Sequence, residues 1–176
     1  SDGSLAPLNV EKLAKLINDA CEDLEEVSVN EVLDEALKNL YDGVSVADMR
    51  TSLVMSARTK VEKEPNYSFV TARILMDQLR SEALSFLKIA DESTYQEMEA
   101  NYPKAFKAYI DKGVELDILN PALKEFDLDK LGAAIDYTRD NQFTYLGLQT
   151  LYDRYFIHCE DTRYELPQVF FMRVAM

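Results

Sequence analysis

The chain has 176 residues, and its composition, 47% hydrophobic and 29% charged, is typical of a globular protein with one ordinary domain or two small ones. Asp and Glu number 32 against 19 for Lys and Arg, which gives a formal net charge of −13 at pH 7. Because the acidic excess runs through both halves, we exclude nucleic-acid binding by bulk charge and a polybasic membrane anchor. No stretch approaches the roughly 20 apolar residues of a membrane-spanning helix.

The cysteines and the lone histidine offer little chemistry. Cys21 and Cys159 lie far apart, and His158 precedes the second of them. A structural zinc site needs about four nitrogen or sulfur ligands, so we expect no metal site and a reduced, cytoplasmic protein. His158 and Cys159 are a base and a nucleophile by type, but neighbours in a strand point to opposite faces, which favours a structural interpretation. Cys21 is assigned to core packing.

Helix signals dominate the first half of the chain. Each predicted helix begins at a side chain suited to capping and continues with apolar residues at spacings of three and four. Gly43 suits a left-handed turn after the second helix, and Pro65 interrupts the pattern after the third. The predicted helices are 10–24 after Asn9, 29–40 after Ser28, 46–61 after Ser45 and 66–86 starting at Asn66.

The pattern loosens after Leu87, and a boundary at 87–91 predicts two domains, 1–87 and 88–176. Proline suits the first turn of a helix and not its interior, so Pro103 predicts two helices that meet there. The predicted elements are helices 94–101, 103–112, 121–126, 127–135 and 143–153, a hairpin of strands 155–158 and 163–166, and a last helix from Pro167. The fold class is therefore mainly α.

The residues alone reveal no catalytic apparatus. Glycine is scarce, and there is no glycine-rich phosphate loop. Acidic pairs such as Glu22-Asp23 and Asp127 with Asp129 have neither a histidine nor apolar neighbours, so we interpret them as solvated surface. From composition and spacing, the chain is an acidic, mostly helical protein with no candidate catalytic residue.

A series of short motifs extends in order over nearly the whole chain. The first half contains Asp2-Gly3-Ser4, Leu8–Lys12, Tyr41-Asp42-Gly43, Pro65-Asn66-Tyr67, Thr71-Ala72-Arg73 and Leu79-Arg80. The second contains Asp136–Asp140, Phe143–Leu151, Tyr155-Phe156-Ile157 and Glu165–Ala175. The first set resembles the ATP cone of ribonucleotide reductases. The second resembles the helical segment that follows the cone in class I large (α) subunits, most of all the bacterial class Ia kind.

The resemblance implies an enzyme that reduces ribonucleoside diphosphates to deoxyribonucleotides for DNA synthesis. Its implied partners are a radical-generating small (β) subunit, a second large subunit, and the catalytic barrel of the same chain. In the family the catalytic cysteines lie beyond the residue matching Met176, and Cys21 and Cys159 match none of them. The implied fold is a truncated four-helix cone, without its first hairpin strand, followed by an all-helical domain with a small β-hairpin near the C-terminus.

The family's cone binds ATP or dATP as allosteric effectors beneath a β-hairpin lid. Here Ala6-Pro7 replaces an acidic–basic pair, Val46 replaces a threonine and Ser81 replaces a lysine, so that Lys12 alone remains. Anion sites use cations, hydroxyl donors and helix N-termini, which these replacements remove. We expect a degenerate cone that serves as a structural or docking module, with no cofactor in this part of the parent. The alternative is a working sensor built on Lys12 and the N-termini of the first and third helices.

The two ends of the sequence carry expectations of their own. The chain starts without Met and stops inside the apolar run Val169–Met176, which predicts a piece of a longer protein. We expect Phe170, Phe171 and Val174 to pack on residues outside this sequence or on a neighbouring copy. A free-standing helical interaction protein is a third hypothesis, against which the specific run Asp140–Ala175 argues.

Overall fold

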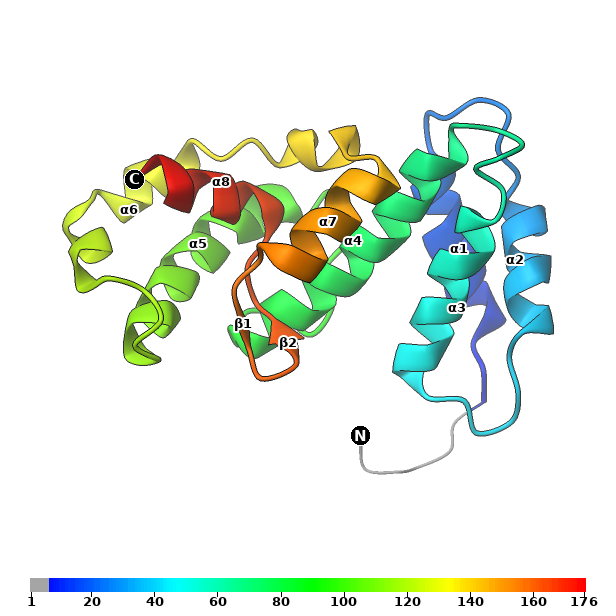
Figure 1. Ribbon diagram of the computed structural model, residues 1–176, viewed down its shortest axis with the longest axis horizontal. Helices are drawn as coiled ribbons and strands as arrows, with labels where there is room; N and C mark the ends of the chain where they lie inside the picture. The colour runs from blue at the N-terminus through cyan, green and yellow to red at the C-terminus, as the bar shows by residue number, and fades with distance from the viewer. Residues whose placement is uncertain (1–6) are drawn as a thin grey trace. The chain divides into compact units, whose positions relative to one another are not determined.

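The computed structural model describes residues 7–176, and this part of the chain is mostly helical (Figure 1). The fold class expected from the sequence, mainly α with a small hairpin near the C-terminus, is confirmed. The α-helices are α1 (Val10–Cys21), α2 (Val29–Lys38), α3 (Val46–Arg58), α4 (Tyr67–Phe86), α5 (Met98–Glu115), α6 (Leu128–Ala133), α7 (Tyr145–Arg154) and α8 (Pro167–Ala175). Two 3₁₀ helices, η1 (Pro121–Glu125) and η2 (Tyr137–Gln142), and two strands, β1 (His158–Cys159) and β2 (Thr162–Arg163), complete the set.

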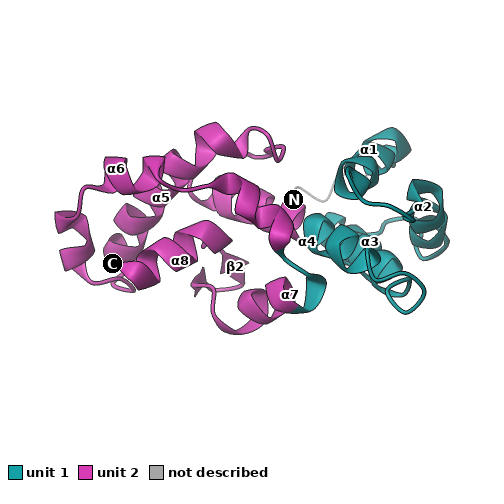
Figure 2. Cartoon of the chain, turned by 90° about the horizontal axis from the view of Figure 1, so that it is seen from above, with its two compact units in different colours: residues 1–75, 143–146 teal, residues 76–142, 147–176 magenta. Residues whose placement is uncertain are grey.

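The residues group by mutual contact into two compact units, coloured separately in Figure 2. Unit 1 runs to Leu75 and also takes in Phe143–Leu146. Unit 2 contains residues 76–142 and 147–176, so the division falls within α4. The division does not test the domains 1–87 and 88–176, which stay a prediction.

The first three helices of unit 1 begin where their capping residues predict. In each, a side-chain oxygen of the cap accepts a hydrogen bond from a backbone N–H three residues later, which satisfies one of the free donors of the first turn. The three bonds are Lys12 N to Asn9 Oδ1 at 2.9 Å, Glu31 N to Ser28 Oγ at 3.3 Å, and Asp48 N to Ser45 Oγ at 3.0 Å. Gly43, between α2 and α3, has φ +84°, as its predicted left-handed position requires.

Unit 1 buries one apolar stripe from each of its helices. Helix α2 packs against both α1 and α3, and runs in the opposite direction to these two (Figure 1). The buried apolar side chains of the unit are Leu13, Ile17, Ala20, Val32, Ala36, Leu53, Val54, Ala57, Tyr67, Val70, Ala72, Ile74 and Leu75. Their spacing of three and four residues along α1, α2 and α3 is the pattern from which these helices are predicted.

The start of α4 holds the connection between α1 and α2. This connection turns sharply, and the non-glycine residues Asp23 and Glu26 both adopt positive φ, at 59° and 58°. The Arg73 guanidinium donates hydrogen bonds to the carbonyl oxygens of Ala20 at 3.1 Å and Glu22 at 2.6 Å. It thereby satisfies acceptors that the end of α1 leaves without helical partners.

Two further bonds fix the same connection. The Tyr67 hydroxyl accepts a hydrogen bond from the backbone N–H of Ser28 at 2.9 Å, and Asn66 Nδ2 donates to the carbonyl oxygen of Glu25 at 3.0 Å. Tyr67 is buried, so this N–H has a protein partner in place of water. The motifs 65–67 and 71–73 therefore have an architectural role in unit 1.

A segment from late in the sequence also belongs to unit 1. The backbone N–H of Tyr145 donates to Ser68 Oγ at 3.2 Å, and the Arg58 guanidinium lies 5.5 Å from the centre of the Tyr145 ring. The second contact has the geometry of a cation–π interaction. Residues 143–146 thus contact the end of α3 and the start of α4 across a long separation in sequence.

In unit 2 the long helix α5 packs against α6, α8, η1 and η2. The prediction of two helices meeting at Pro103 was wrong, because α5 continues through this proline. A proline near a helix start sacrifices one backbone hydrogen bond. The continuous buried stripe of α5 offsets that loss, and Gly132 of α6 allows a close approach there, since a Cβ on it would lie 3.2 Å from the Pro103 Cα. The buried residues of α5 are Met98, Tyr102, Ala105, Phe106, Tyr109, Ile110 and Gly113.

The predicted hairpin is present but shorter than expected. The strands pair antiparallel, with His158 opposite Arg163 and Cys159 opposite Thr162. The residues after β2 leave the ladder and enter the core, where Tyr164 stacks on Phe86 with ring centres 4.8 Å apart. Burial of these side chains accounts for the early end of the strand. The helix predicted from Pro167 is confirmed as α8, whereas η2 was not predicted.

We predict that Tyr67→Phe lowers the free energy of unfolding by about 1–2 kcal/mol, because the Ser28 N–H loses its partner while the ring and its packing remain. Urea unfolding followed by circular dichroism measures the change. Tyr41→Phe is the matched control, since Tyr41 is 66% exposed and should change stability by less than about 0.5 kcal/mol. Equal stabilities of the Tyr67→Phe variant and the wild type would contradict the assigned role of this hydroxyl.

Candidate functional site

The one basic residue left from the expected effector site is at the start of α1. Lys12 is exposed, and its backbone N–H is the donor bound by the Asn9 cap. Glu11 occupies the same first turn. The positive end of the α1 dipole therefore already has a side-chain acceptor and a carboxylate beside it, and both reduce its attraction for a phosphate.

The N-terminus of α3 is arranged in the same way. Ser45 accepts the hydrogen bond of Asp48 N at 3.0 Å and donates its own hydroxyl to Asp48 Oδ2 at 2.8 Å. Val46, where the resemblance expects a threonine, is the first residue of the helix and is 62% exposed. An exposed isopropyl group at this position provides no hydrogen-bond donor to a ligand.

The third replaced position falls in the other unit. Ser81 lies on the part of α4 that belongs to unit 2, and it is only 8% exposed. Lys12 and Val46 belong to unit 1. Pro7 is exposed, while Ala6 and the motif Asp2-Gly3-Ser4 lie outside the described residues. Lys12 and Val46 are thus the two positions of the expected effector site that are exposed, lie in the first turn of a helix and belong to the same unit.

Unit 2 contains a buried carboxylate at the end of the motif Asp136–Asp140. Asp140 of η2 is 3% exposed and accepts hydrogen bonds from the Tyr102 hydroxyl at 2.6 Å and from Gln168 Nε2 at 2.9 Å. Burial raises the pKa of Asp140 to about 6, although both hydrogen bonds favour the charged form. Burial and this nearby carboxylate raise the pKa of Tyr102, which therefore stays protonated as the donor.

A second buried carboxylate lies between β2 and α8. Glu165 is fully buried, and it accepts bonds from the Tyr109 hydroxyl at 2.6 Å and from Ile157 N at 2.8 Å. Arg173 completes the cluster, with Nε 2.6 Å from one carboxylate oxygen and Nη2 3.3 Å from the other. Each oxygen has two donors, so the cluster joins α5, α8 and the end of β1–β2 as a satisfied ionic network.

The expectation that acidic residues lie on the solvated surface does not hold for Asp140 and Glu165, which are buried. A signal for Glu165 was present, because Tyr164 and Leu166-Pro167 enclose it in an apolar stretch. Asp140 has polar neighbours on both sides, so nothing local distinguishes it from a surface residue. Its burial depends on Tyr102 and Gln168, which are distant in sequence.

The pair His158 and Cys159 does not form a catalytic arrangement. His158 is exposed, and its Nδ1 lies 2.8 Å from the carbonyl oxygen of Glu160 within the hairpin turn. Cys159 and Cys21 are half-buried free thiols, and burial raises the pKa of Cys21, although Arg73 opposes the shift. A thiol with a raised pKa is a poor nucleophile at neutral pH.

Within residues 7–176, no group of three or more His, Cys, Asp or Glu side chains is arranged to hold a metal ion. Nor does any helix in that range combine the length and the apolar character that crossing a membrane demands.

We predict that Asp140→Asn changes the pH dependence of stability. Because the folded-state pKa of about 6 lies above the ordinary 3.8, the wild type gains stability from this group as the pH falls through 6 and levels off below about 4. Its free energy of unfolding relative to the variant should rise by up to about 3 kcal/mol between pH 7 and pH 4. Urea unfolding over this range tests it, with the exposed Asp161→Asn as control. A constant difference across the range would disprove the shift.

Two family models match the chain. Residues 1–82 match the ATP cone domain, and residues 141–176 match the all-alpha domain of ribonucleotide reductase. The second match contains Gln168, a partner of Asp140, and it contains Glu165 with its partners Ile157 and Arg173 but not Tyr109; the first contains α1–α3.

Similar proteins extend these matches over nearly the whole chain. The α subunit of ribonucleoside-diphosphate reductase from Chlamydia trachomatis serovar D is 41% identical over 177 residues, which cover 99% of this chain and 16% of that protein. The corresponding subunit from Helicobacter pylori is 32% identical over 178 residues, covering 99% and 21%. Subunit α of ribonucleoside-diphosphate reductase 1 from Escherichia coli K12 is 25% identical over 181 residues, covering 99% and 22%. The chain spans less than a quarter of the length of these relatives, and it belongs to the family of ribonucleotide reductase large (α) subunits.

Proposed function

We propose that this chain is the N-terminal regulatory and structural part of a ribonucleotide reductase large subunit. The parent would reduce ribonucleoside diphosphates to deoxyribonucleotides for DNA synthesis in the cytoplasm. The two family models and the names of the relatives support this proposal. We propose no catalytic residue in the chain itself, since Cys21 and Cys159 are half-buried thiols, burial raises the pKa of Cys21, and the Nδ1 of His158 lies against the carbonyl oxygen of Glu160.

We further propose that the cone region binds neither ATP nor dATP. The observation that carries this proposal is the state of the α1 and α3 N-termini. The N-terminus of α1 is capped by the side chain of Asn9 and that of α3 by the side chain of Ser45. Each helix also has an acidic residue in its first turn, Glu11 in α1 and Asp48 in α3. A nucleotide triphosphate would have to compete with these groups at both helices.

The magnitudes favour the same conclusion. A micromolar site requires about 8 kcal/mol of binding free energy, whereas one hydrogen bond to a charged group contributes about 1.5–3 kcal/mol. Lys12 can supply one such contact, and Val46 supplies none. The net charge of −13 adds repulsion for an anion. On this proposal the cone region positions neighbouring parts of the parent, and effectors act elsewhere in it.

A functional ATP- or dATP-sensing cone is the second candidate. The match of residues 1–82 to the ATP cone domain favours it, and so does the exposed position of Lys12. In this case Lys12 and the N-terminal turns of α1 and α3 would be the phosphate-binding groups.

Calorimetric titration of ATP and of dATP into the chain, with Mg²⁺ present, distinguishes the two candidates. We expect no heat of binding up to millimolar nucleotide. Micromolar binding that Lys12→Ala abolishes, and that Lys15→Ala preserves, would overturn the proposal and establish a working sensor. Lys15 is a suitable control because it is an exposed lysine on the same helix, paired with Asp19 at 2.7 Å.

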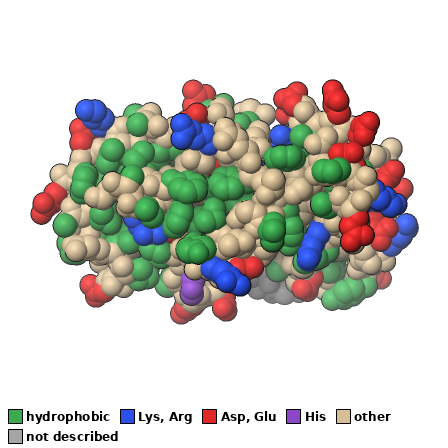
Figure 3. All heavy atoms as spheres, turned by 45° about the horizontal axis from the view of Figure 1, so that its top comes forward, with side chains coloured by type: hydrophobic (Ala, Val, Ile, Leu, Met, Phe, Trp, Pro, Cys, Tyr) green, Lys and Arg blue, Asp and Glu red, His purple; other side chains and the backbone are tan. Residues whose placement is uncertain are grey.

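We also propose that one face of α8 packs against the catalytic barrel of the same parent chain. Phe171 is 47% exposed and Val174 is 63% exposed, and the ring of Phe171 contacts that of Phe170, which in turn contacts that of Tyr155. Hydrophobic side chains gather on the surface of unit 2 in this region (Figure 3). The other proposed partners of the parent are a radical-generating small (β) subunit and a second large subunit, which the relatives' description as α subunits supports.

From the α8 face we predict that the chain alone self-associates. Light scattering over a concentration series should show a mass above that of a monomer, because association covers the exposed apolar side chains. The double variant Phe171→Asp/Val174→Asp should be monomeric. Val10→Asp/Val46→Asp, which changes two exposed apolar residues of unit 1, should behave as the wild type. A wild-type chain that remains monomeric at every concentration would contradict the prediction.

A further inference from the structure

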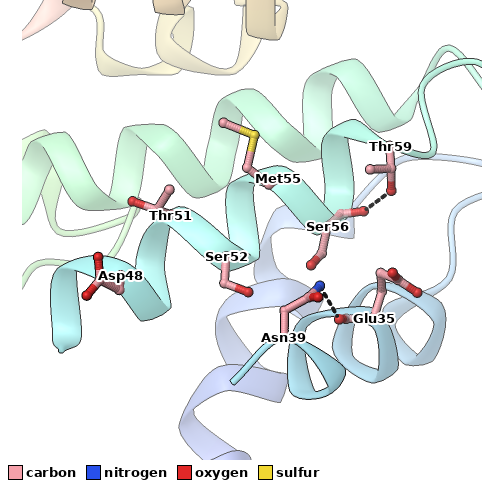
Figure 4. Close-up of a pocket in the computed structure, with 8 residues that line it drawn as sticks. All are labelled: Glu35, Asn39, Asp48, Thr51, Ser52, Met55, Ser56 and Thr59. Carbon is pink, nitrogen blue, oxygen red and sulfur yellow. Dashed lines mark hydrogen bonds between the residues drawn. The ribbon is translucent and has the colours of Figure 1, made fainter. Parts of the chain in front are cut away.

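Unit 1 contains a groove between α2 and α3 that the effector-binding hypothesis does not use. Its volume is about 390 Å³, within the range of small-molecule sites. Figure 4 shows Ser52 and Ser56 pointing from α3 toward Glu35 of α2 and Asn39, the residue directly after that helix. The lining residues are Glu35, Asn39, Asp48, Thr51, Ser52, Met55, Ser56 and Thr59.

Two hydroxyl groups in the groove are buried without partners. The Oγ atoms of Ser52 and Ser56 are closed to solvent and make no hydrogen bond within the protein. Ser56 as a whole is only 2% exposed. Buried polar side-chain atoms nearly always have a partner, because an unpaired one has lost its hydrogen bonds to water without replacing them. Two such atoms, one helical turn apart on one face of α3, indicate a place where a ligand supplies the missing bonds.

Three other polar side chains of the groove already donate hydrogen bonds to backbone carbonyl oxygens. Thr51 Oγ1 donates to the carbonyl oxygen of Ala47 at 3.0 Å, and Thr59 Oγ1 donates to that of Ser56 at 2.9 Å. Asn39 Nδ2 donates to the carbonyl oxygen of Glu35 at 2.9 Å. These groups therefore present mainly oxygen acceptors to the groove, and they suit a ligand rich in N–H donors.

The charge of the groove is negative. Glu35 and Asp48 contribute carboxylates, and no Lys or Arg is among the lining residues. Lys38 approaches Glu35 only at 3.5 Å and is 70% exposed, so it neutralises that carboxylate weakly. An anion such as a nucleotide is disfavoured here, whereas a cation is attracted.

We propose that this groove binds a linear aliphatic polyamine. One ammonium group would pair with Asp48 near the start of α3 and another with Glu35 farther along the groove. The methylene chain would lie along the groove, and an inner amine would donate to the Ser52 and Ser56 hydroxyls once these side chains rotate out of positions that are closed to solvent. From Asp48 to Thr59 the helix rises about 16 Å at about 1.5 Å per residue, which gives an extended polyamine room along the axis. The proposal is independent of whether the cone region binds nucleotide.

Titration of spermidine into the chain at low ionic strength tests the proposal, by calorimetry and by the NMR shifts of backbone amides. We expect saturable one-to-one binding, with the largest shifts in residues 48–59. Glu35→Gln/Asp48→Asn should weaken binding at least tenfold. Glu11→Gln/Glu25→Gln removes the same charge from exposed positions of unit 1 outside the groove and should weaken it less than twofold. Equal weakening in both double variants would overturn the proposal in favour of non-specific charge attraction.

A second variant separates the hydroxyl groups from the charges. Ser52→Ala/Ser56→Ala removes both unpartnered oxygens without adding volume, so the fold should be kept, as circular dichroism can verify. We expect threefold to tenfold weaker spermidine binding, and n-butylamine, with a single ammonium group, should bind the wild type at least tenfold more weakly than spermidine. Absence of spermidine binding to the wild type, or unchanged affinity in the serine variant, would overturn the proposed site.

Discussion

The first unit depends on the hydrogen bonds between the beginning of α4 and the connection that precedes α2. Without the Arg73 guanidinium, the carbonyl oxygens at the end of α1 would lose protein partners in a turn with two residues of positive φ. The Tyr67 hydroxyl and the Asn66 amide complete the same attachment. The apolar stripes of α1 and α2 can pack as they do because this turn is fixed, so a few polar contacts determine where a larger apolar surface is buried.

The features that make the helices of unit 1 well defined also make their ends poor anion sites. Asn9 and Ser45 satisfy backbone donors, and the acidic residues of the first turns favour the helix dipoles. A phosphate would require the same donors and the opposite charge. The α2–α3 groove has the complementary property, since the hydroxyls of Thr51 and Thr59 and the amide of Asn39 donate to backbone carbonyl oxygens and face the groove chiefly with oxygen. In both places, local hydrogen bonding determines which ligand charge can be accommodated.

Much of unit 1 follows from local sequence, because capping side chains and a 3–4 apolar spacing act over a few residues. Asn9, Ser28 and Ser45 were correctly predicted as caps, and Gly43 as a left-handed turn. The errors in unit 2 have non-local causes. Helix α5 continues through Pro103 because its buried stripe extends past it, and Asp140 is buried by partners from α5 and α8. The groove is equally non-local, since the serines that face it are unremarkable on their own helix.

The placement of residues 143–146 affects how the protein can be divided. A polypeptide that ended at residue 87 would contain α1–α4 and the whole match to the ATP cone domain, yet it would lack the Tyr145 segment. Ser68 and Arg58 would then face water where the intact chain gives them a backbone N–H and an aromatic ring. The stability measured for an excised cone would therefore understate that of the same helices in the uncut polypeptide.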